Sequence, residues 1–367
     1  MEHLDVMKLW NYLHTIPELG FKEFKTAEFL ADELEKLGYK VMRNVGGTGV
    51  IGEIKGQEPG PTIMVRADMD ALPFVIEGKD AVIHACGHDA HCSMVLAAAS
   101  LVAAKIKRGT LLILFQPGEE TLKGALAIID TGLVDNVDVA MGLHIRPIQD
   151  IPNGTMTPAI CHGSSTFAQV RIVGKGCHGS RPHLGINACD AVAAIINAIN
   201  AIKINPVLSW SCKVTNIKAG SAAPNIIPNT AQLVVDCRAQ TNEAMTEMLG
   251  KLRTAVTNAA ASVGATATVD TPDGVIPAAN LDEKLTAEVA ECIKEVVGEN
   301  NLQPILINPG GDDFHYYAQR NKQLRAAFFG IGCAAEPGLH DPDMHFNHEM
   351  MPLGVEVLVK MLLKKLV

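Results

Sequence analysis

Short apolar runs alternate with helical stretches over the first 162 residues, and this alternation restricts the folds open to the chain. Four runs have the length and composition of buried strands: residues 49–54, 62–65, 111–115 and 137–143. Helical patterns occupy residues 91–104 and 125–129, and two more amphipathic helices are expected before residue 38, the second from residue 21. Strands without a polar face that alternate with helices are typical of an α/β sheet covered on both faces.

The pattern changes near residue 163. The next elements follow the order strand, helix, strand, strand, helix, strand, over residues 167–173, 190–202, 211–217, 231–238, 243–262 and 266–269. This is the ferredoxin-like order of an α+β domain. Strand and helix patterns of the first kind return at 281–297, 304–307, 326–329 and 352–366. We therefore expect a mixed-sheet α/β domain of residues 1–162 and 276–367, interrupted by a smaller inserted domain of residues 163–275.

Composition narrows the class of protein. The 367 residues suffice for two domains, and 48% hydrophobic with 19% charged residues is a globular composition. A formal net charge of −9 argues against a nucleic-acid partner, because phosphate binding needs a basic face. The first residues form neither a basic n-region nor an apolar h-region, and no apolar run reaches about 18 residues, so neither a signal peptide nor a membrane span is expected. Nine cysteines without framework spacing then predict reduced thiols in a cytoplasmic protein.

The segment His84-Ala85-Cys86-Gly87-His88-Asp89-Ala90-His91 carries the densest chemical signal. It lies between a predicted strand and a predicted helix, where ligands gather in α/β sheets. Gly87 allows a sharp turn, so Cys86 and His88 can point into one site, and thiolate with imidazole suits zinc or a similar ion. A buried thiol beside surface histidines fits the same residues, so this segment alone leaves both interpretations open.

Two carboxylates directly follow the apolar strand at 111–115, in Phe115-Gln116-Pro117-Gly118-Glu119-Glu120. Adjacent glutamates project differently, so one can bind a metal ion while the other moves protons. A metal ligand cannot do both, because it is held deprotonated. Taken alone, the segment is better explained as a solvated acidic turn at the start of a helix, where Glu is common.

Three further groups of metal-binding residue types fall at predicted strand ends. They are Asp68 and Asp70 after residues 62–65, His144 after residues 137–143, and the histidines His340, His345 and His348 after residues 326–329. One of the two aspartates can orient a ligating histidine. Each group has an ordinary structural explanation by itself. The prediction of a metal site depends on their coincidence at strand-to-loop positions of a single domain.

Together these segments resemble the aminoacylase and carboxypeptidase G family of two-metal peptidases. Within it they resemble the amidohydrolase branch of hippurate hydrolases, N-acetyldiaminopimelate deacetylases and plant auxin-conjugate hydrolases. The resemblance covers nearly the whole chain. Its motifs are residues 14–21 (HTIPELGF), 68–73, 84–91, 115–120, 174–178 with Pro182-His183, 225–228, Asp313-Phe314 and His340.

The resemblance implies a catalytic α/β domain with an inserted lid, and two divalent ions, which would be zinc, manganese or cobalt. The implied metal ligands are Cys86, His88, Glu120, His144 and His340. Glu119 is implied as general base and acid. His178 in the lid is implied to polarise the scissile carbonyl, within its own subunit or across a homodimer formed through the lid. Asn225 and Arg238 are implied to hold substrate, with Arg238 suited to its carboxylate.

Three positions depart from the family pattern. Asp68 stands where the wider family has a histidine, a change that the amidohydrolase branch shares and balances with Cys86. Gly118 stands where the branch usually has alanine. The segment between Pro73 and His84 is shorter than is usual in the branch, so the rim of the pocket is expected to differ.

The activity implied by the resemblance is hydrolysis of the amide bond of a small N-acyl amino acid to a carboxylic acid and a free amino acid. A dipeptidase or carboxypeptidase of the same family is an alternative, as is a catalytically silent metal-binding protein. A dipeptidase needs an acidic group for the free ammonium, and a pure binder has no use for Glu119 as a proton carrier. A serine hydrolase is disfavoured, because Gly163-Ser164-Ser165 lacks the glycines of a nucleophile elbow.

Overall fold

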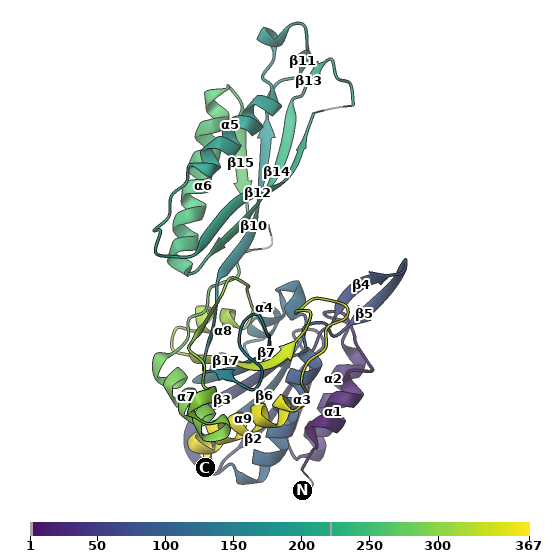
Figure 1. Cartoon of the computed structure of the whole chain (residues 1–367), viewed down its shortest axis with the longest axis vertical. Coiled ribbons are helices and arrows are strands. Elements are labelled where there is room, and N and C mark those ends of the chain that lie inside the picture. The colour runs from purple at the N-terminus through teal and green to yellow at the C-terminus, as the bar shows by residue number, and fades with distance from the viewer. Residues whose placement is uncertain (1–2, 221, 273) are drawn as a thin grey trace. The chain divides into compact units, whose positions relative to one another are not determined.

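The chain forms two compact units in the computed structural model, which describes residues 3–220, 222–272 and 274–367 (Figure 1). Unit 1 comprises Met1–Cys161, Asn280–Ile307 and Asp312–Val367. Unit 2 comprises His162–Ala279 and Asn308–Gly311. Each unit has its own hydrophobic core.

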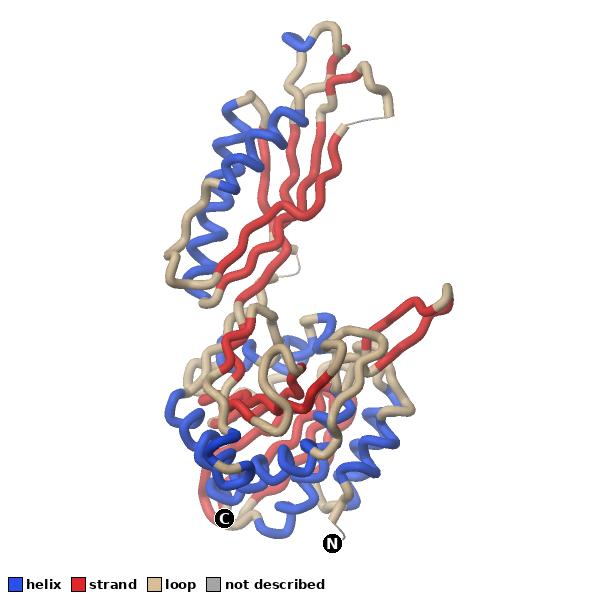
Figure 2. The backbone as a smooth tube through the Cα atoms, in the orientation of Figure 1, coloured by secondary structure: helices blue, strands red, loops and turns tan. Residues whose placement is uncertain are grey.

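Unit 1 is built on a seven-stranded mixed sheet in the order β1-β2-β6-β3-β7-β17-β8 (Figure 2). The strands β6, β3, β7 and β17 run parallel to one another, whereas β1, β2 and β8 run antiparallel to their neighbours. The bounds are β1 (Lys40–Val45), β2 (Gly49–Lys55), β3 (Glu58–Asp68), β6 (Arg108–Gln116), β7 (Val139–Pro147), β8 (Met156–Thr157) and β17 (Arg325–Ala335). The mixed α/β class expected from the sequence is confirmed.

Helices cover both faces of this sheet. One core joins the sheet to α1 (Val6–Leu13), α2 (Phe24–Lys36), α3 (His88–Val102), α7 (Glu283–Val297) and α9 (Met350–Leu366). The core on the other face contains residues of α4 (Gly124–Ile129) and α8 (His315–Arg320). Every residue of α3 except Leu101 is buried, including the polar residues His88, Asp89 and His91 at its start. The first residues of α3 are therefore fixed in place by the core.

Several element bounds differ from those expected. The strand expected at 62–65 is longer, because β3 continues through the charged residue Arg66 to Asp68. The helix expected from residue 21 begins only at Phe24, since Phe21 has a left-handed φ of 61° that a helix cannot contain. The first helix, α1, begins after its N-cap Asp5, whose carboxylate accepts hydrogen bonds from the amides of Met7 and Lys8.

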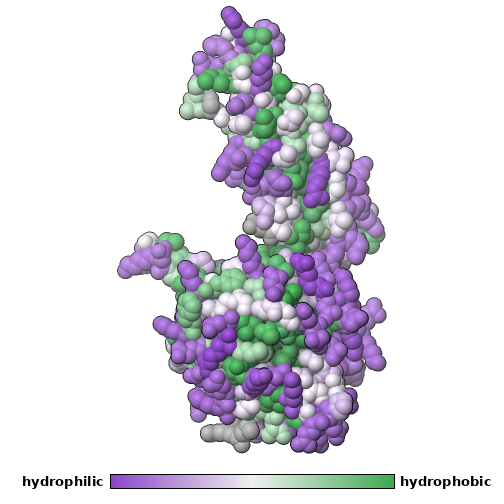
Figure 3. Space-filling model, turned by 180° about the vertical axis from the view of Figure 1, so that it is seen from behind, coloured by the Kyte–Doolittle hydropathy of each residue, from purple (hydrophilic) through white to green (hydrophobic). Residues whose placement is uncertain are grey.

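Residues 72–83 form a tight hairpin of β4 (Leu72–Ile76) and β5 (Lys79–Ile83), which the sequence patterns did not predict. Its two-residue loop, Glu77-Gly78, has φ values of 50° and 76°, the signs that a type I′ turn requires. The hairpin stands out from the surface of unit 1 and mixes hydrophobic with hydrophilic residues (Figure 3). Val75 is 72% exposed. The segment whose length departs from the family pattern therefore adopts a defined local structure.

Unit 2 contains a four-stranded antiparallel sheet in the order β12-β14-β10-β15. Along the chain its main elements are β10 (Ser164–Val173), α5 (Ala188–Asn200), β12 (Trp210–Ala219), β14 (Thr230–Ala239), α6 (Asn242–Ser262) and β15 (Thr266–Asp270). The two helices pack on one face of the sheet, where alternate strand residues such as Val170, Leu233 and Val235 are buried. Short paired strands β11 (Cys177–His178) and β13 (Ile226–Ile227) extend this unit.

The remaining short elements are β9 (Ile160–His162), which pairs with β16 (Leu306–Asn308), and four 3-10 turns. The turns are η1 (Ala103–Lys105), η2 (Glu119–Thr121), η3 (Pro182–Leu184) and η4 (Glu299–Asn301). Among the residues described, every helix falls short of the length and apolar character that a bilayer crossing demands. All nine cysteines are unpaired thiols.

Candidate metal centre

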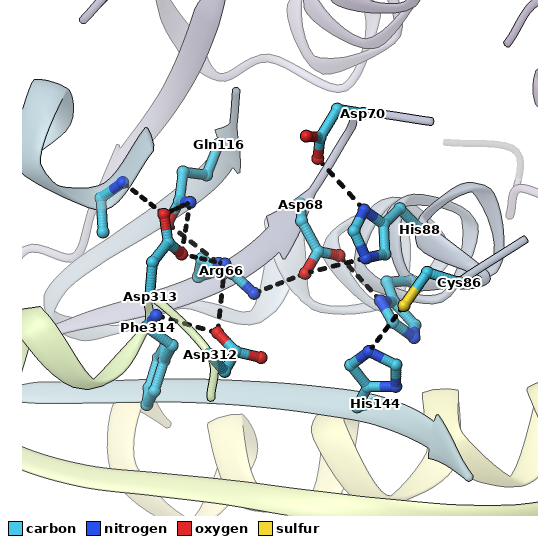
Figure 4. Close-up of polar contacts among 12 residues, drawn as sticks. Arg66, Asp68, Asp70, Cys86, His88, Gln116, His144, Asp312, Asp313 and Phe314 are labelled. Atoms are coloured by element: carbon cyan, nitrogen blue, oxygen red, sulfur yellow. Dashed lines mark hydrogen bonds and ion pairs between the residues drawn. The ribbon is translucent and has the colours of Figure 1, made fainter. Parts of the chain in front are cut away.

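Several of the polar residues singled out in the sequence of unit 1 gather at one edge of its large sheet, among them Asp68, Asp70, Cys86, His88 and His144 (Figure 4). β3 ends at Asp68, β6 ends at Gln116 just before the two glutamates, and β7 carries His144. The carboxyl ends of parallel strands meet at the same edge of a sheet, which is why residues far apart in the chain converge here. Cys86 and His88 reach the same place from the start of α3.

Two groups of candidate metal ligands share Cys86. Its sulfur lies within 4.8 Å of ligand atoms of His88 and His144, and these three side chains are buried. Cys86 forms a second group, with the same spacing, with Glu120 and His340. The Cys86 sulfur is 3.5 Å from His144 Nε2, and His340 Nε2 is 3.3 Å from Glu120 Oε1. The structure thus brings all five predicted ligands together in two groups around one thiol.

Neighbouring hydrogen bonds orient the histidines. His88 Nδ1 is 3.1 Å from Asp70 Oδ1, so the ring donates from Nδ1 and presents Nε2 to the cluster. His144 Nδ1 donates to the carbonyl oxygen of Ile145 at 2.6 Å and presents Nε2 to Cys86. Such partners fix the tautomer of a metal-binding histidine. Burial holds the pKa of His144 well below its usual value, which keeps the ring neutral and able to bind a cation.

The donor set fits bound cations on two further observations. Among the described residues, His88 Nε2 is buried and has no hydrogen-bond partner, although it lies 3.8 Å from Glu120 Oε1. Leaving a buried polar atom unpaired costs about 1–3 kcal/mol, so this nitrogen at the centre of the ligand groups indicates a missing partner. Burial also raises the pKa of the Cys86 thiol to about 12, so a thiolate forms here at neutral pH only when a cation compensates its charge.

The two adjacent glutamates have different surroundings, as the chemistry requires. Burial alone would raise the pKa of Glu120. Its contact with His340 and the nearby His88 outweigh burial, so the pKa is lowered. Glu119 is buried in η2, within 4.8 Å of ligand atoms of His88 and Glu120. Burial, with the charge of Asp312 next in size, raises the pKa of Glu119 well above its usual value in the absence of bound cations. Glu119 is thus placed beside the ligands with a carboxylate that holds a proton readily.

Asp68 supports the cluster through His91, a residue whose role the sequence analysis did not identify. His91 Nδ1 lies 2.7 Å from Asp68 Oδ1, and its Nε2 accepts from the backbone amide of Ile145 at 3.0 Å. Both ring nitrogens are therefore occupied, so His91 is not placed as a ligand. The spacing of His88 and His91, three residues apart at the start of one helix, was the sequence signal that the two rings face the same way.

A buried ion-pair network is centred on Arg66 (Figure 4). The guanidinium of Arg66 is 2.6 Å from Asp68, 2.7 Å from Asp313 and 3.4 Å from Asp312. Sequence patterns gave no indication of this network, because Arg66 and Asp313 are 247 residues apart. The motif Asp313-Phe314 was visible in the sequence, but without a role.

The three C-terminal histidines are in different environments. His340 stands at the tip of a loop closed by hydrogen bonds between the backbones of Glu336 and His345, and its amide donates to the carbonyl of Ala85 at 2.7 Å. Its φ of 67° is strained for a residue with a side chain, a feature common at functional sites. His345 bonds to the carbonyl of Asp343, and the His348 ring lies 3.9 Å from that of Trp10.

Three residues implied by the resemblance lie in unit 2. His178 is exposed on β11, and its Nδ1 is 2.8 Å from the hydroxyl of Ser180. Asn225 is exposed just before β13, and its backbone carbonyl accepts from the amide of Gly179. Arg238 lies on β14, where its guanidinium is 3.2 Å from the carboxylate of Asp236. Their roles remain predictions.

Comparison with known proteins identifies the class. Residues 64–364 match peptidase family M20/M25/M40. The chain is 33% identical over 333 residues to thermostable carboxypeptidase 1 of Saccharolobus solfataricus, covering 86% of this chain and 83% of that protein. It is 30% identical to hippurate hydrolase of Campylobacter jejuni over 98% of this chain and 96% of that protein.

A solved structure agrees with these sequence matches. The Bacillus subtilis YXEP protein, described as a dinuclear metal-binding peptidase of the M20 family, superposes with a TM-score of 0.82 at 26% identity. The alignment covers 98% of this chain and 97% of that one. The chain therefore belongs to the M20/M25/M40 peptidase family and is a hydrolase that acts on amide bonds.

The environments of the C-terminal histidines give a first prediction. His340→Ala should lose at least one equivalent of bound metal, because it removes the nitrogen that faces Glu120. His345→Ala is the matched control, since it leaves intact the backbone bonds that close the loop. Elemental analysis of the purified variants measures the difference. Metal loss confined to His345→Ala would show that the wrong histidine was assigned.

Proposed function

We propose that the chain is an N-acyl-amino-acid amidohydrolase that holds two divalent ions at Cys86, His88, Glu120, His144 and His340. The observation that carries the proposal is the pair of ligand groups that share Cys86, with Glu119 beside them. A hydrolase of this family needs bound cations and a separate proton carrier, and the two adjacent glutamates meet these needs from different environments. The relative named hippurate hydrolase supports an N-acyl amino acid as the substrate class.

Zinc, manganese and cobalt all suit this mixed set of sulfur, nitrogen and oxygen donors. Divalent ions bound there would activate a water molecule and polarise the amide carbonyl. Glu119 takes a proton from the attacking water and returns it to the nitrogen of the leaving amine, so the amide bond breaks to a carboxylic acid and an amino acid. Asp70 keeps the His88 ring turned toward the ligands during this cycle.

We extend the proposal to unit 2, residues 163–275 in the sequence-based division, as a ferredoxin-like lid. Its support is the order of its strands and helices and the family resemblance. In this proposal His178 donates to the oxyanion that develops on the substrate carbonyl, and Asn225 and Arg238 bind the substrate. His178 can act on a substrate bound in its own subunit, or on one bound in the other subunit of a homodimer formed through unit 2.

A carboxypeptidase or dipeptidase activity is the second candidate, because the chain is also similar to a thermostable carboxypeptidase. A substrate panel separates the two. N-acetyl and N-benzoyl amino acids should be hydrolysed in the presence of Mn²⁺ or Zn²⁺, in preference to dipeptides with a free amino group. Prolonged chelation should abolish turnover, and added metal should restore it.

The panel has three contrary outcomes. Preference for free dipeptides would favour the second candidate. Absence of any turnover in fully metal-loaded protein would favour a silent metal-binding protein. Full activity in protein shown by elemental analysis to be metal-free would exclude the two-metal proposal.

Substitutions of the two adjacent glutamates are predicted to have different effects on kcat and metal content. Glu119→Gln keeps the size of the side chain but removes the proton carrier, so kcat should fall by roughly 10²–10⁴ with metal content unchanged. Glu120→Gln should lose metal, and excess metal should partly restore its activity. Steady-state kinetics and elemental analysis of both variants test this division. Normal turnover in Glu119→Gln would remove the proposed base, and equal metal loss in both variants would mean that both bind metal.

The proposed role of His178 has its own test. Loss of one oxyanion donor costs roughly 10²–10³ in kcat, so His178→Ala should show a fall of this order while its metal content stays at the wild-type level. His183→Ala serves as a control, since this nearby histidine has no assigned role. A His178→Ala enzyme with wild-type kcat would limit unit 2 to covering or assembling the protein.

A further inference from the structure

The segment that carries the two glutamates is anchored at both ends by one buried carboxylate. Asp313 accepts from the side-chain amide of Gln116 at 2.8 and 2.9 Å and from the backbone amide of Ala125 at 2.8 Å. Within the segment, the amide of Glu120 donates to Asp70 Oδ2 at 2.9 Å. The backbone of Glu120, the proposed metal ligand, is therefore held by Asp70, independently of the contacts that hold the residues before it.

A third buried carboxylate, that of Glu23, holds the residue before Glu119. The amide of Gly118 donates to Glu23 Oε1 at 2.8 Å, and the hydroxyl of Thr48 donates to Glu23 Oε2. Glu23 is 0% exposed, although it lies in a segment rich in charged residues. Burying a carboxylate is costly unless both oxygens are satisfied, and here they are satisfied by one structural hydroxyl and one amide of the catalytic segment.

The residues just before Glu23 fit closely around Gly118. Gly118 has a φ of 59°, and a Cβ at this position would lie 2.6 Å from the ring of Phe21. A Cβ on Gly20 would lie 3.1 Å from the Cα atom of Gly118. The backbone of Gly118 is thus held by the carboxylate of Glu23 and confined by the ring of Phe21. This close fit explains why glycine stands at 118, where the branch usually has alanine.

We propose that Glu23 is a positioning residue that sets the orientation of Glu119 through the backbone amide of Gly118. This inference rests on the proposed role of Glu119 as proton carrier. Glu120 is anchored separately by Asp70, so loss of the Glu23 contact changes the direction of Glu119 more than the position of the metal ligand. The N-terminal motif at residues 14–21 has no role in the proposed chemistry. It leads directly into Glu23, and its last residue, Phe21, packs beside Gly118.

Three substitutions separate this positioning role from a general contribution to stability. Glu23→Met keeps the volume of the side chain and removes both acceptors. Glu23→Gln retains the acceptor for Gly118, and its amide nitrogen can donate to the oxygen of Thr48. Thr48→Val removes only the structural hydroxyl and leaves the contact with Gly118 in place.

The experiment measures kcat, KM and metal content of the full-length, metal-loaded enzyme with an N-acyl amino acid. Misplacing a catalytic group by about 1 Å costs on the order of 10² in rate, so Glu23→Met should lose between about 10-fold and 10²-fold in kcat, with KM and metal content close to wild type. Glu23→Gln and Thr48→Val should both keep a kcat close to wild type.

Three results would overturn the inference: a wild-type kcat in Glu23→Met, a fall in kcat that follows loss of metal, or an equal fall in Thr48→Val. If Glu23→Met does not fold, Glu23→Asp replaces it, since it keeps the charge and retracts the acceptor by one methylene. A wild-type kcat in Glu23→Asp overturns the inference equally. Normal turnover in Glu119→Gln would instead refute the proposed function, so the two failures are distinguishable.

Discussion

The rest of the site depends on the ion pairs made by the buried guanidinium of Arg66. It is 1% exposed and pairs with Asp68 at 2.6 Å and Asp313 at 2.7 Å. Asp68 in turn holds His91, and Asp313 holds both ends of the segment that carries the two glutamates. Removing one partner of a buried ion pair costs about 3–5 kcal/mol, because a charge remains uncompensated. The single side chain of Arg66 on β3 thereby holds Asp68 and Asp313, which are far apart in the sequence.

The same region holds more buried carboxylates than Arg66 can balance. Arg66 faces three aspartates, Glu119 lies within 4.8 Å of two of them, Asp312 and Asp313, and Glu120 lies beside Glu119. Burial, together with the charges of the neighbouring carboxylates, raises the pKa of Glu119, and the unpaired Nε2 of His88 lies in the same cluster. A cation that binds here relieves the repulsion among carboxylates as well as satisfying the donors. Metal binding and folding stability are therefore coupled in this protein.

The sequence indicated a metal site because several groups of metal-binding residue types fall at strand-to-loop positions of one predicted domain, and the family resemblance then implied which of them are ligands. Local patterns alone left each segment open, and it was their coincidence in one domain that predicted a shared site; the structure brings Cys86, His88 and the two glutamates together. Glu23 could not be identified, since it was expected on a helix starting at residue 21. A positive φ at Phe21 delays α2 and leaves Glu23 as its buried N-cap. Backbone conformations of this kind depend on tertiary packing, here the contact with Gly118.

Ion pairs between residues far apart in the sequence could not be predicted either. Arg66 was a charged residue at the end of an apolar run, and nothing local indicated that Asp313 would face it. The β4-β5 hairpin was missed because residues 72–83 mix apolar and charged side chains without a clear period of two. The missed features are thus of two kinds, long-range charge pairs and short strands that are at most half-buried.

The pairing of β7 with β17 has a consequence for how the enzyme comes into being. These neighbouring strands are separated in the chain by the whole of unit 2, and His340 follows β17. A chain leaving the ribosome presents Cys86, His88 and Glu120 long before His340, so the second group of ligands stays open through most of synthesis. In the proposed ligand set, the second group can therefore be completed only after translation has passed residue 340.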